Sequence, residues 1–412
     1  MHRIAIFAAF SLALTSLGRA ASAAPSVEEL IRVGVEQLIA MQESDGAWPY
    51  EGVYRVAGQI PIGYRVGGTA IVCQTLLAAA PEDAAARAAI ERGVEFVLSQ
   101  LDDERMTPST KDAYDVRVWG HCYALELFCR LRAADRMGRH ADAIRPWFSK
   151  LVEALITEEL KGGGWNYANR RAHAAFVTAP VTQTLLLARE QGEQVPDEVL
   201  LRARRALTRS RFEDGAYLYS GVRREGQGAG DREPGTDAEE RHADSRSNVQ
   251  SPIPKVPATR PTTRPARPAR TAALPGSIAR SAICESTLLL LDGGSADSVQ
   301  RAVDAFHAHW DELEKRRGKT GTHAGPYGIA PYYFYYGHRY AAQAIQMLPE
   351  NDRARERARM LDVILRTRAD DGTWNDRVFP RSRNYGTAMI VLALLGDRAP
   401  LPPALNALPA GR

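Results

Sequence analysis

The chain has 412 residues, of which 45% are hydrophobic, 25% charged and 8% aromatic, and these fractions exclude a collagen-like, a wholly disordered or a multi-pass membrane protein. Two arginines lie in the first 23 residues, and six positive charges with no acid lie between Arg246 and Arg270, so the remainder of the chain carries a net charge of −4 within a total of +4. This charge balance does not indicate a nucleic-acid partner.

The first 23 residues have the pattern of a secretory signal peptide. A short basic start with Arg3 precedes an apolar run over residues 4–17, and Ala21, Ser22 and Ala23 match the small-residue cleavage pattern. The apolar run is too short to cross a bilayer comfortably, although a retained membrane anchor is the alternative. We therefore expect cleavage after Ala23, a secreted or periplasmic product, and no transmembrane segment after cleavage.

After the leader, a two-helix pattern recurs six times along the chain. A first helix rich in Ala, Leu, Arg and Glu leads through a glycine-containing turn to an aromatic residue, and a more apolar second helix follows. The six units pair residues 27–41 with 68–80, 89–100 with the helix that ends near 131, 146–160 with 177–190, 197–211 with 278–291, 298–317 with 331–347, and 353–368 with 385–395.

Such a pair cannot bury its apolar face alone, and stacked pairs bury it between neighbours. Six pairs with the more apolar helices inside can close into a ring, whereas an open superhelix of hairpins is the alternative. The pattern therefore predicts an all-α fold, an (α/α)6 toroid of six helical hairpins over residues 24–400. A flexible C-terminal tail is expected over residues 401–412.

The fourth unit is interrupted by a segment of different composition, over residues 224–275. Its first part is rich in acids, and its second part is rich in Pro and Arg and has no acid. Because it has no apolar periodicity, it cannot offset the entropy of becoming ordered. We expect a disordered insertion within the toroid, either a tolerated surface loop or a basic arm for an anionic polymer or membrane surface.

The four cysteines, Cys73, Cys122, Cys129 and Cys284, lie in apolar stretches and have no zinc-ligand spacing. Cys122 and Cys129 are seven residues apart on one helix, about 10 Å along its axis, which is too far for a bond between them. We expect buried free thiols, with a disulfide between helices as the alternative. No motif for a metal or another cofactor is present, and none is expected.

The first turn carries a recognisable motif. Gly34, Leu38, Gln42, Gly46 and Trp48 form the string G-x3-L-x3-Q-x3-G-x-W. This string resembles the QW repeat of squalene cyclases and protein prenyltransferase β subunits. The resemblance implies an α/α toroid with a funnel-shaped central cavity in which isoprenoid or other ligands bind.

Parts of the same motif recur elsewhere, as the front half at residues 92–100 and the back half at residues 371–374. In the repeat, the Gln and Trp tie the end of one outer helix to its neighbour. Gln42, Trp48, Trp165 and Trp374 are therefore expected to be structural residues.

The catalytic motifs of that superfamily are missing from the chain. The Asp-x-Asp-Asp motif, the proton donor of squalene-type cyclases, occurs nowhere in the sequence. The zinc-binding Asp-x-Cys pair of the prenyltransferases is missing too, because Asp115 and Cys122 are seven residues apart. The resemblance therefore implies the fold and a cavity more than an activity.

Candidate site residues lie where the inner helices begin, because those helix starts converge on one mouth of a toroid. A histidine and an aspartate there could act as a base and its orienting partner, and tyrosines could line an apolar tunnel or stack on sugar rings. The candidate catalytic residues are Asp115, His121 and His338. The candidate ligand-binding residues are Trp119, Phe176, Tyr327, Tyr332, Tyr335, Arg339 and Tyr385.

Each candidate has a structural alternative. His121 and His338 could be core histidines, Asp115 could cap a helix or pair with Arg117, and the tyrosines could be packing residues. Three functions remain open: an exported protein that binds a lipid-like or carbohydrate ligand in an aromatic cavity without the superfamily's catalytic motifs, a polysaccharide lyase or hydrolase that uses Asp and His at the cavity mouth, and a divergent terpenoid cyclase. The sequence does not indicate protein partners.

Overall fold

The computed structural model of the chain describes residues 25–108, 115–168, 172–222 and 274–409. The predicted signal peptide (1–23) lies outside the described residues, and so does the predicted insertion (224–275) apart from its last two residues. Those two residues open a short 3-10 helix, Leu274–Gly276, that leads into the next α-helix.

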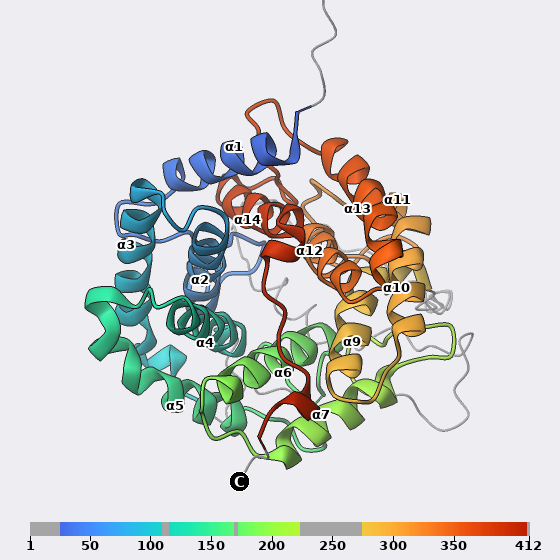
Figure 1. Ribbon diagram of the computed structural model, residues 1–412, viewed down its shortest axis with the longest axis horizontal. Helices are drawn as coiled ribbons and strands as arrows, with labels where there is room; N and C mark the ends of the chain where they lie inside the picture. Colours follow the sequence, from blue (N-terminus) through green and yellow to red (C-terminus); the bar gives the residue numbers. More distant parts are fainter. Residues whose placement is uncertain (1–24, 109–114, 169–171, 223–273, 410–412) are drawn as a thin grey trace, which may run out of the picture.

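Twelve long helices of the described residues form two concentric rings around one axis (Figure 1). The outer ring holds α1 (Val27–Ala40), α3 (Ala84–Leu101), α5 (Ala141–Thr157), α7 (Asp197–Ser210), α10 (Ala296–Ala308) and α13 (Glu350–Leu365). The inner ring holds α2 (Ile62–Ala79), α4 (Arg117–Ala133), α6 (Ala175–Glu190), α9 (Ile278–Leu290), α12 (Tyr333–Gln346) and α14 (Arg383–Leu394). A short helix, α11 (Trp310–Glu314), follows α10. The last inner helix, α14, packs against α1 and α2, so six hairpins close into the predicted toroid.

The inner and outer helices differ in composition because the inner helices are surrounded by protein, whereas one side of each outer helix faces solvent. The inner helix α2 has 15 buried residues out of 18, and they lie on all of its faces. The outer helix α13 has only four buried residues out of 16. A helix surrounded by protein is apolar all round, whereas a surface helix buries one apolar stripe. The apolar second helix of each predicted unit is therefore the inner one.

The turn between the outer and inner helix has the same construction in three hairpins. The indole Nε1–H of Trp48, Trp165 and Trp374 donates to a carbonyl ten residues earlier on the outer helix, at 2.7, 2.6 and 3.0 Å. The backbone N–H of each tryptophan donates to a threonine hydroxyl on the inner helix, at 2.9, 3.0 and 3.1 Å. These contacts confirm that the three tryptophans are structural residues.

The contact between neighbouring hairpins that the resemblance implied is made by Gln42. Its side-chain amide donates to the carbonyl of Gly46 at 3.0 Å and to the carbonyl of Ala89 on the next outer helix at 2.9 Å. Gly46 has φ +90°, and a Cβ at this position would lie 2.5 Å from the carbonyl oxygen of Arg92. The turn therefore requires glycine, both for its backbone angle and for this close approach.

The C-terminal segment differs from the flexible tail that the sequence predicted. Residues 401–409 cross the face of the ring at which the inner helices end (Figure 1). Leu405 and Leu408 pack against the core. The Asn406 amide donates to the Asp292 carboxylate at 3.0 Å, and the Arg189 guanidinium donates to a carbonyl of the segment near its end. Apolar burial and these hydrogen bonds fix the path of the segment.

All four cysteines are buried free thiols, as expected from the sequence, and burial raises the pKa of each thiol. In the described part of the chain, β-structure is limited to isolated bridges. Over the same residues, no helix combines the length and the apolar character that a membrane span requires.

Candidate functional site

Twelve aromatic side chains of the described residues gather inside the ring, at and below the mouth where the inner helices begin. We call them the aromatic cluster: Tyr50, Tyr64, Trp119, Tyr123, Tyr167, Phe176, Tyr219, Tyr332, Tyr333, Tyr336, Tyr340 and Tyr385. Neighbouring ring centroids lie 4.6 to 6.4 Å apart, mostly edge to face. Such pairs contribute about 0.5–1.5 kcal/mol each beyond the burial of their area.

The ring contacts of the cluster form one connected chain. On one side Trp119 contacts Tyr64, at 5.4 Å between centroids. On the other side Phe176 stacks on Tyr219 at 5.2 Å. Tyr167 joins the two sides, because its ring centroid lies 6.4 Å from Tyr64 and 5.4 Å from Phe176. Side chains from loops and from five inner helices thus form one aromatic inner wall.

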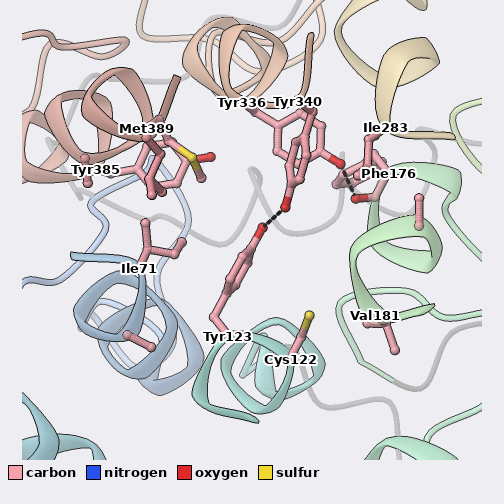
Figure 2. Packing of buried hydrophobic residues seen from close by; sticks show 14 of the residues in the cluster. Ile71, Cys122, Tyr123, Phe176, Val181, Ile283, Tyr336, Tyr340, Tyr385 and Met389 are labelled. Atoms are coloured by element: carbon pink, nitrogen blue, oxygen red, sulfur yellow. Dashed lines mark hydrogen bonds between the residues drawn. The ribbon is translucent and has the colours of Figure 1, made fainter. Parts of the chain in front are cut away.

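The two sides also meet on the axis of the ring. Tyr123 on α4 and Tyr340 on α12 point toward one another, and their hydroxyl oxygens are 2.9 Å apart (Figure 2). The Tyr336 hydroxyl donates to the backbone carbonyl of Phe176 at 2.6 Å. These hydroxyls therefore have partners in the interior of the ring, as buried tyrosines require.

Only three members of the cluster are partly exposed, namely Trp119, Tyr219 and Tyr332. Trp119 lies in the first turn of α4, and Tyr332 directly precedes α12. The Tyr332 hydroxyl contacts the His323 Nε2 at 3.0 Å. The accessible rings of the cluster therefore lie at the mouth where the inner helices begin.

Asp115 lies at this mouth, directly before α4. Its backbone carbonyl accepts a hydrogen bond from the N–H of Gly63 at 2.9 Å. The side chain is mostly buried, and burial raises the pKa of its carboxyl group. Arg117, considered above as its partner, forms a fully buried ion pair with Glu158, with Nε and Oε1 2.7 Å apart. The N-cap position of α4 belongs to Val116, which makes no side-chain cap.

His121 points away from the interior of the ring. It lines a groove of about 420 Å³ between α3, α4 and α5, together with Met106, Trp147 and Leu151. Burial lowers the pKa of the imidazole to about 4, although a hydrogen bond to the backbone of Met106 opposes this effect. The neutral ring therefore belongs to the layer between the inner and outer helices.

His338 is also in the layer between the rings, and its side chain is 0% exposed. The Trp310 indole donates to its Nε2 at 2.9 Å, so Nδ1 carries the proton and donates to the Phe334 carbonyl at 2.8 Å. Burial lowers the pKa of His338 to about 3. This arrangement matches the core-histidine alternative.

The predicted meeting of Asp115, His121 and His338 at one mouth is therefore corrected. The two histidines lie on the outward faces of α4 and α12, and these helices stand on different sides of the ring (Figure 1). Only Asp115 lies at the mouth.

The predicted ligand-binding residues divide into three groups. Trp119, Phe176, Tyr332 and Tyr385 belong to the aromatic cluster. Tyr327 is partly buried and lies beside the turn at Gly276. Two predictions need correction: Tyr335 faces outward and donates to the carbonyl of Thr367 at 3.4 Å, whereas Arg339 lines a cavity at the opposite mouth.

A carboxyl group that sequence reasoning missed lies beside the cluster. Asp376 is 0% exposed, and neither of its carboxyl oxygens has a hydrogen-bond partner among the described residues. Burial raises its pKa to about 7, against the opposing charge of Arg377. Burial raises the pKa of Tyr50 and Tyr385, and the Asp376 charge adds to this effect, so the carboxyl group lies near these two rings of the cluster.

Alignment of the repeats could have identified Asp376. It stands two residues after Trp374, and the residues two after Trp48, Trp165 and Tyr217 are Tyr50, Tyr167 and Tyr219. All three tyrosines belong to the aromatic cluster. Asp376 therefore occupies the position at which three other hairpins direct a ring into the interior.

Arg377, the residue after Asp376, contacts residues at the mouth. Its guanidinium donates to the Tyr50 hydroxyl and to the Gly321 carbonyl, both at 3.4 Å, and its Cζ lies 5.6 Å from the centre of the Tyr332 ring. No group of three or more His, Cys, Asp or Glu side chains is arranged for a metal ion within the described ranges. Chemically, the arrangement offers an apolar aromatic surface and one buried carboxyl group that can exchange a proton near neutral pH.

No protein-family model matches the chain, and no curated protein matches it. Among solved structures, it is similar to an inactive variant of an alpha-1,6-mannanase of Salegentibacter sp. HEL1_6 in complex with alpha-1,6-mannotetrose. The identity is 11%, the TM-score is 0.52, and 90% of this chain and 100% of that chain are covered.

Two further solved structures are similar at lower scores. One is a type II terpene cyclase variant from Scytonema in complex with geranylgeranyl dihydroxybenzoate, with 15% identity, a TM-score of 0.49, and 91% and 97% of the two chains covered. The other is a D-mannose isomerase, with 10% identity, a TM-score of 0.49, and 90% and 99% covered. At these identities the comparisons concern the fold alone. The closed ring of six hairpins, together with the similarity to the mannanase structure, confirms that the chain is an α/α toroid, the fold that its resemblance to squalene cyclases implied.

Proposed function

We propose that this protein binds a lipid-like ligand at the aromatic cluster, through the mouth where the inner helices begin. The observation that carries the proposal is the continuous aromatic wall inside the ring, of which Trp119, Tyr219 and Tyr332 are partly exposed at that mouth. Ligand sites are concave and mainly apolar, with a few polar groups that orient the ligand. Arg377 and Asp376 are such groups here.

The chemistry of the wall favours a lipid over a carbohydrate. Most neighbouring rings meet edge to face, so they present little flat surface on which a sugar could stack. The central hydroxyls of Tyr123, Tyr340 and Tyr336 already have protein partners. A carbohydrate needs many directed hydrogen bonds, because each unpaired buried hydroxyl costs about 1–3 kcal/mol. An apolar chain needs none.

Titration with geranylgeraniol, monitored by tryptophan fluorescence and calorimetry, tests the proposal. Trp119 is the tryptophan of the cluster, and the Trp119→Ala variant is expected to lose the fluorescence change and at least tenfold in affinity. Trp147→Ala is the matched control, because Trp147 lies on the outer helix α5. Binding of alpha-1,6-mannotetraose in place of geranylgeraniol, or equal effects of the two variants, would contradict the proposal.

A second candidate function is proton-initiated chemistry on the bound lipid, as in a divergent terpenoid cyclase. Asp376 favours it, because a buried carboxyl group with a pKa of about 7 is protonated in part of the molecules at neutral pH. The acid would protonate a double bond, and loss of a proton from the resulting cation would complete an isomerisation or cyclisation. Asp376→Asn is expected to retain geranylgeraniol binding and to abolish any conversion, whereas conversion by the variant would exclude this role.

The proposal also includes export of the protein, which rests on the pattern of the first 23 residues. Cleavage after Ala23 and release into the periplasm or medium are the expected events. The mass of the mature chain tests this directly, and a mature protein that retains residues 1–23 would contradict it.

A further inference from the structure

A cavity lies at the opposite mouth, where the inner helices end. It has a volume of about 360 Å³, within the ~300–1,000 Å³ of typical ligand sites. Most of its lining is apolar: Leu77, Ala78, Ala133, Leu187, Leu392 and Leu401. These residues come from α2, α4, α6, α14 and the C-terminal segment, so the cavity lies on the axis of the ring.

The C-terminal segment covers this cavity. Ala399, Pro400 and Leu401 form part of its lining, and the segment crosses the mouth (Figure 1). The Arg130 guanidinium donates to the Pro400 carbonyl at 3.2 Å, which holds the segment against the end of α4.

The cavity contains a buried cation that has no partner among the described residues. Arg339 is 7% exposed and lines the cavity. Its guanidinium has no hydrogen bond or ion pair to any described residue, and it lies beside the Tyr340 ring, at 5.6 Å from Cζ to the ring centre. Burial lowers the pKa of this guanidinium. An arginine so placed is costly unless an anion compensates it.

Other buried arginines of the inner helices show what such a partner looks like. Arg117 pairs with Glu158 at 2.7 Å. Arg189 pairs with Asp197 at 2.5 Å. Arg280 donates to the carbonyls of Tyr217 and Gly276. Arg339 differs from all three, although it is buried to a similar degree.

The carboxylates near the cavity are engaged elsewhere or lie at its rim. Glu126 pairs with Arg130, with 2.7 Å between its Oε1 and the guanidinium nitrogen Nη2. Glu190 is exposed, and Arg398 pairs with Glu28 at 3.2 Å. The Glu126 charge also acts on Arg339, but Glu126 forms its ion pair with Arg130. The Arg339 guanidinium is therefore without a direct partner within a mainly apolar space.

We propose that this cavity binds an amphipathic monocarboxylate, whose head group pairs with Arg339 and whose alkyl chain lies against the leucines. A single guanidinium suits a carboxylate, which it contacts through two parallel N–H donors. A phosphate dianion would need a second cation without a partner, and the other two arginines of the lining, Arg130 and Arg398, are paired with Glu126 and Glu28. The site differs from the mouth of the aromatic cluster, because the Tyr123–Tyr340 hydroxyl pair, the part of the cluster nearest to Arg339, lies one turn below Trp119 along α4.

Calorimetric titration of the mature protein with decanoate, below its micelle-forming concentration, tests the proposal. The Arg339→Met variant is expected to bind decanoate at least tenfold more weakly. Arg398→Met is the matched control, because Arg398 lies at the rim and already has a partner, and its affinity is expected to change less than threefold. Arg339→Met is expected to fold, since it removes an uncompensated buried charge and keeps the volume, and its Tm is expected to be no lower than that of the wild type.

Further titrations distinguish a carboxylate site from general apolar or anion binding, and from the aromatic cluster. Decanol, which has the same chain without the charge, is expected to bind at least tenfold more weakly than decanoate, and inorganic phosphate is expected not to compete. Trp119→Ala is expected to keep the decanoate affinity, while Arg339→Met keeps that for geranylgeraniol. Absence of decanoate binding by the wild type, full binding by Arg339→Met, or loss with Trp119→Ala alone would overturn the proposal. Competition by phosphate at the same concentration would contradict its apolar part.

Discussion

Replacement of Glu158 by glutamine tests the buried electrostatics of the ring. Glu158 follows α5 and pairs with Arg117 in the first turn of α4, with 2.7 Å between Oε1 and Nε and both side chains 1% exposed. Removing one charge of a buried pair leaves the other uncompensated, which costs about 3–5 kcal/mol. Glutamine keeps the size of the side chain and one acceptor, so the loss reports the charge.

The expected shift in Tm follows from the size of the protein. Unfolding entropy is about 2.1 cal/mol/K per residue, or roughly 0.7 kcal/mol/K for about 340 folded residues. A loss of about 3–5 kcal/mol therefore lowers Tm by roughly 4–7 °C. Thermal unfolding followed by circular dichroism measures this shift.

The neighbouring residue provides a matched control. Glu159 pairs with Arg202 at 2.6 Å, but the Arg202 side chain is 37% exposed, so Glu159→Gln is expected to cost less than about 1 kcal/mol. The double replacement Arg117→Met with Glu158→Leu is expected to restore most of the stability, because no lone charge remains. Equal shifts for Glu158→Gln and Glu159→Gln would refute the reasoning.

Four further outcomes follow from the structure. Asp376 has a pKa of about 7 in the folded protein, so between pH 4 and 7 the folded state binds more protons than the unfolded state, and the free energy of unfolding falls by roughly 4 kcal/mol as the pH rises through this range. In Asp376→Asn this fall, measured by urea unfolding at each pH, is expected to be smaller. An unchanged fall would exclude Asp376 as its source. Trp165→Phe removes the 2.6 Å hydrogen bond to the Leu155 carbonyl and is expected to cost about 1–3 kcal/mol, more than Trp147→Phe, and equal thermal shifts would argue against the turn as described. The four buried thiols are expected to react with a thiol reagent only after unfolding, and rapid reaction of the native protein would contradict their burial. The mature chain is expected to begin at Ala24, which intact mass determines, and a longer mature chain would contradict cleavage at that position.

The ring could be predicted from the sequence because its construction is periodic. The recurrence of a polar helix, a turn with an aromatic residue and a more apolar helix defines both rings. The hydrogen bonds of Trp48, Trp165 and Trp374 show that the same turn is repeated in three hairpins. Local sequence patterns carry this information because each hairpin makes the same contacts with its neighbours.

The direction of the site residues was harder to predict, although helix periodicity contains part of the answer. Trp119 and Tyr123 are four residues apart and share the inward face of α4, whereas His121, between them, faces α3 and α5. On α12, Tyr336 and Tyr340 face inward, and Tyr335 faces outward, toward Thr367 just after α13. Positions in one helix turn point in different directions, so proximity to the mouth alone did not place them in one site.

The surroundings of Asp376 and Arg339 depend on tertiary structure. Asp376 is significant only because its loop brings an unpaired carboxyl group beside Tyr50 and Tyr385, from other parts of the chain. Arg339 was predicted at the mouth, and its cavity is completed by the C-terminal segment at Leu401. Neither neighbourhood follows from residues near in sequence.

The central claim, that the aromatic cluster is a site for a lipid-like ligand, is tested most directly by a crystal structure of the mature protein with geranylgeraniol. The account predicts an extended apolar chain that lies against Trp119, Phe176 and Tyr385 and enters between the starts of the inner helices. A ligand found only on the outer surface, or tyrosine side chains that fill the interior with no ligand between them at saturating geranylgeraniol, would contradict it.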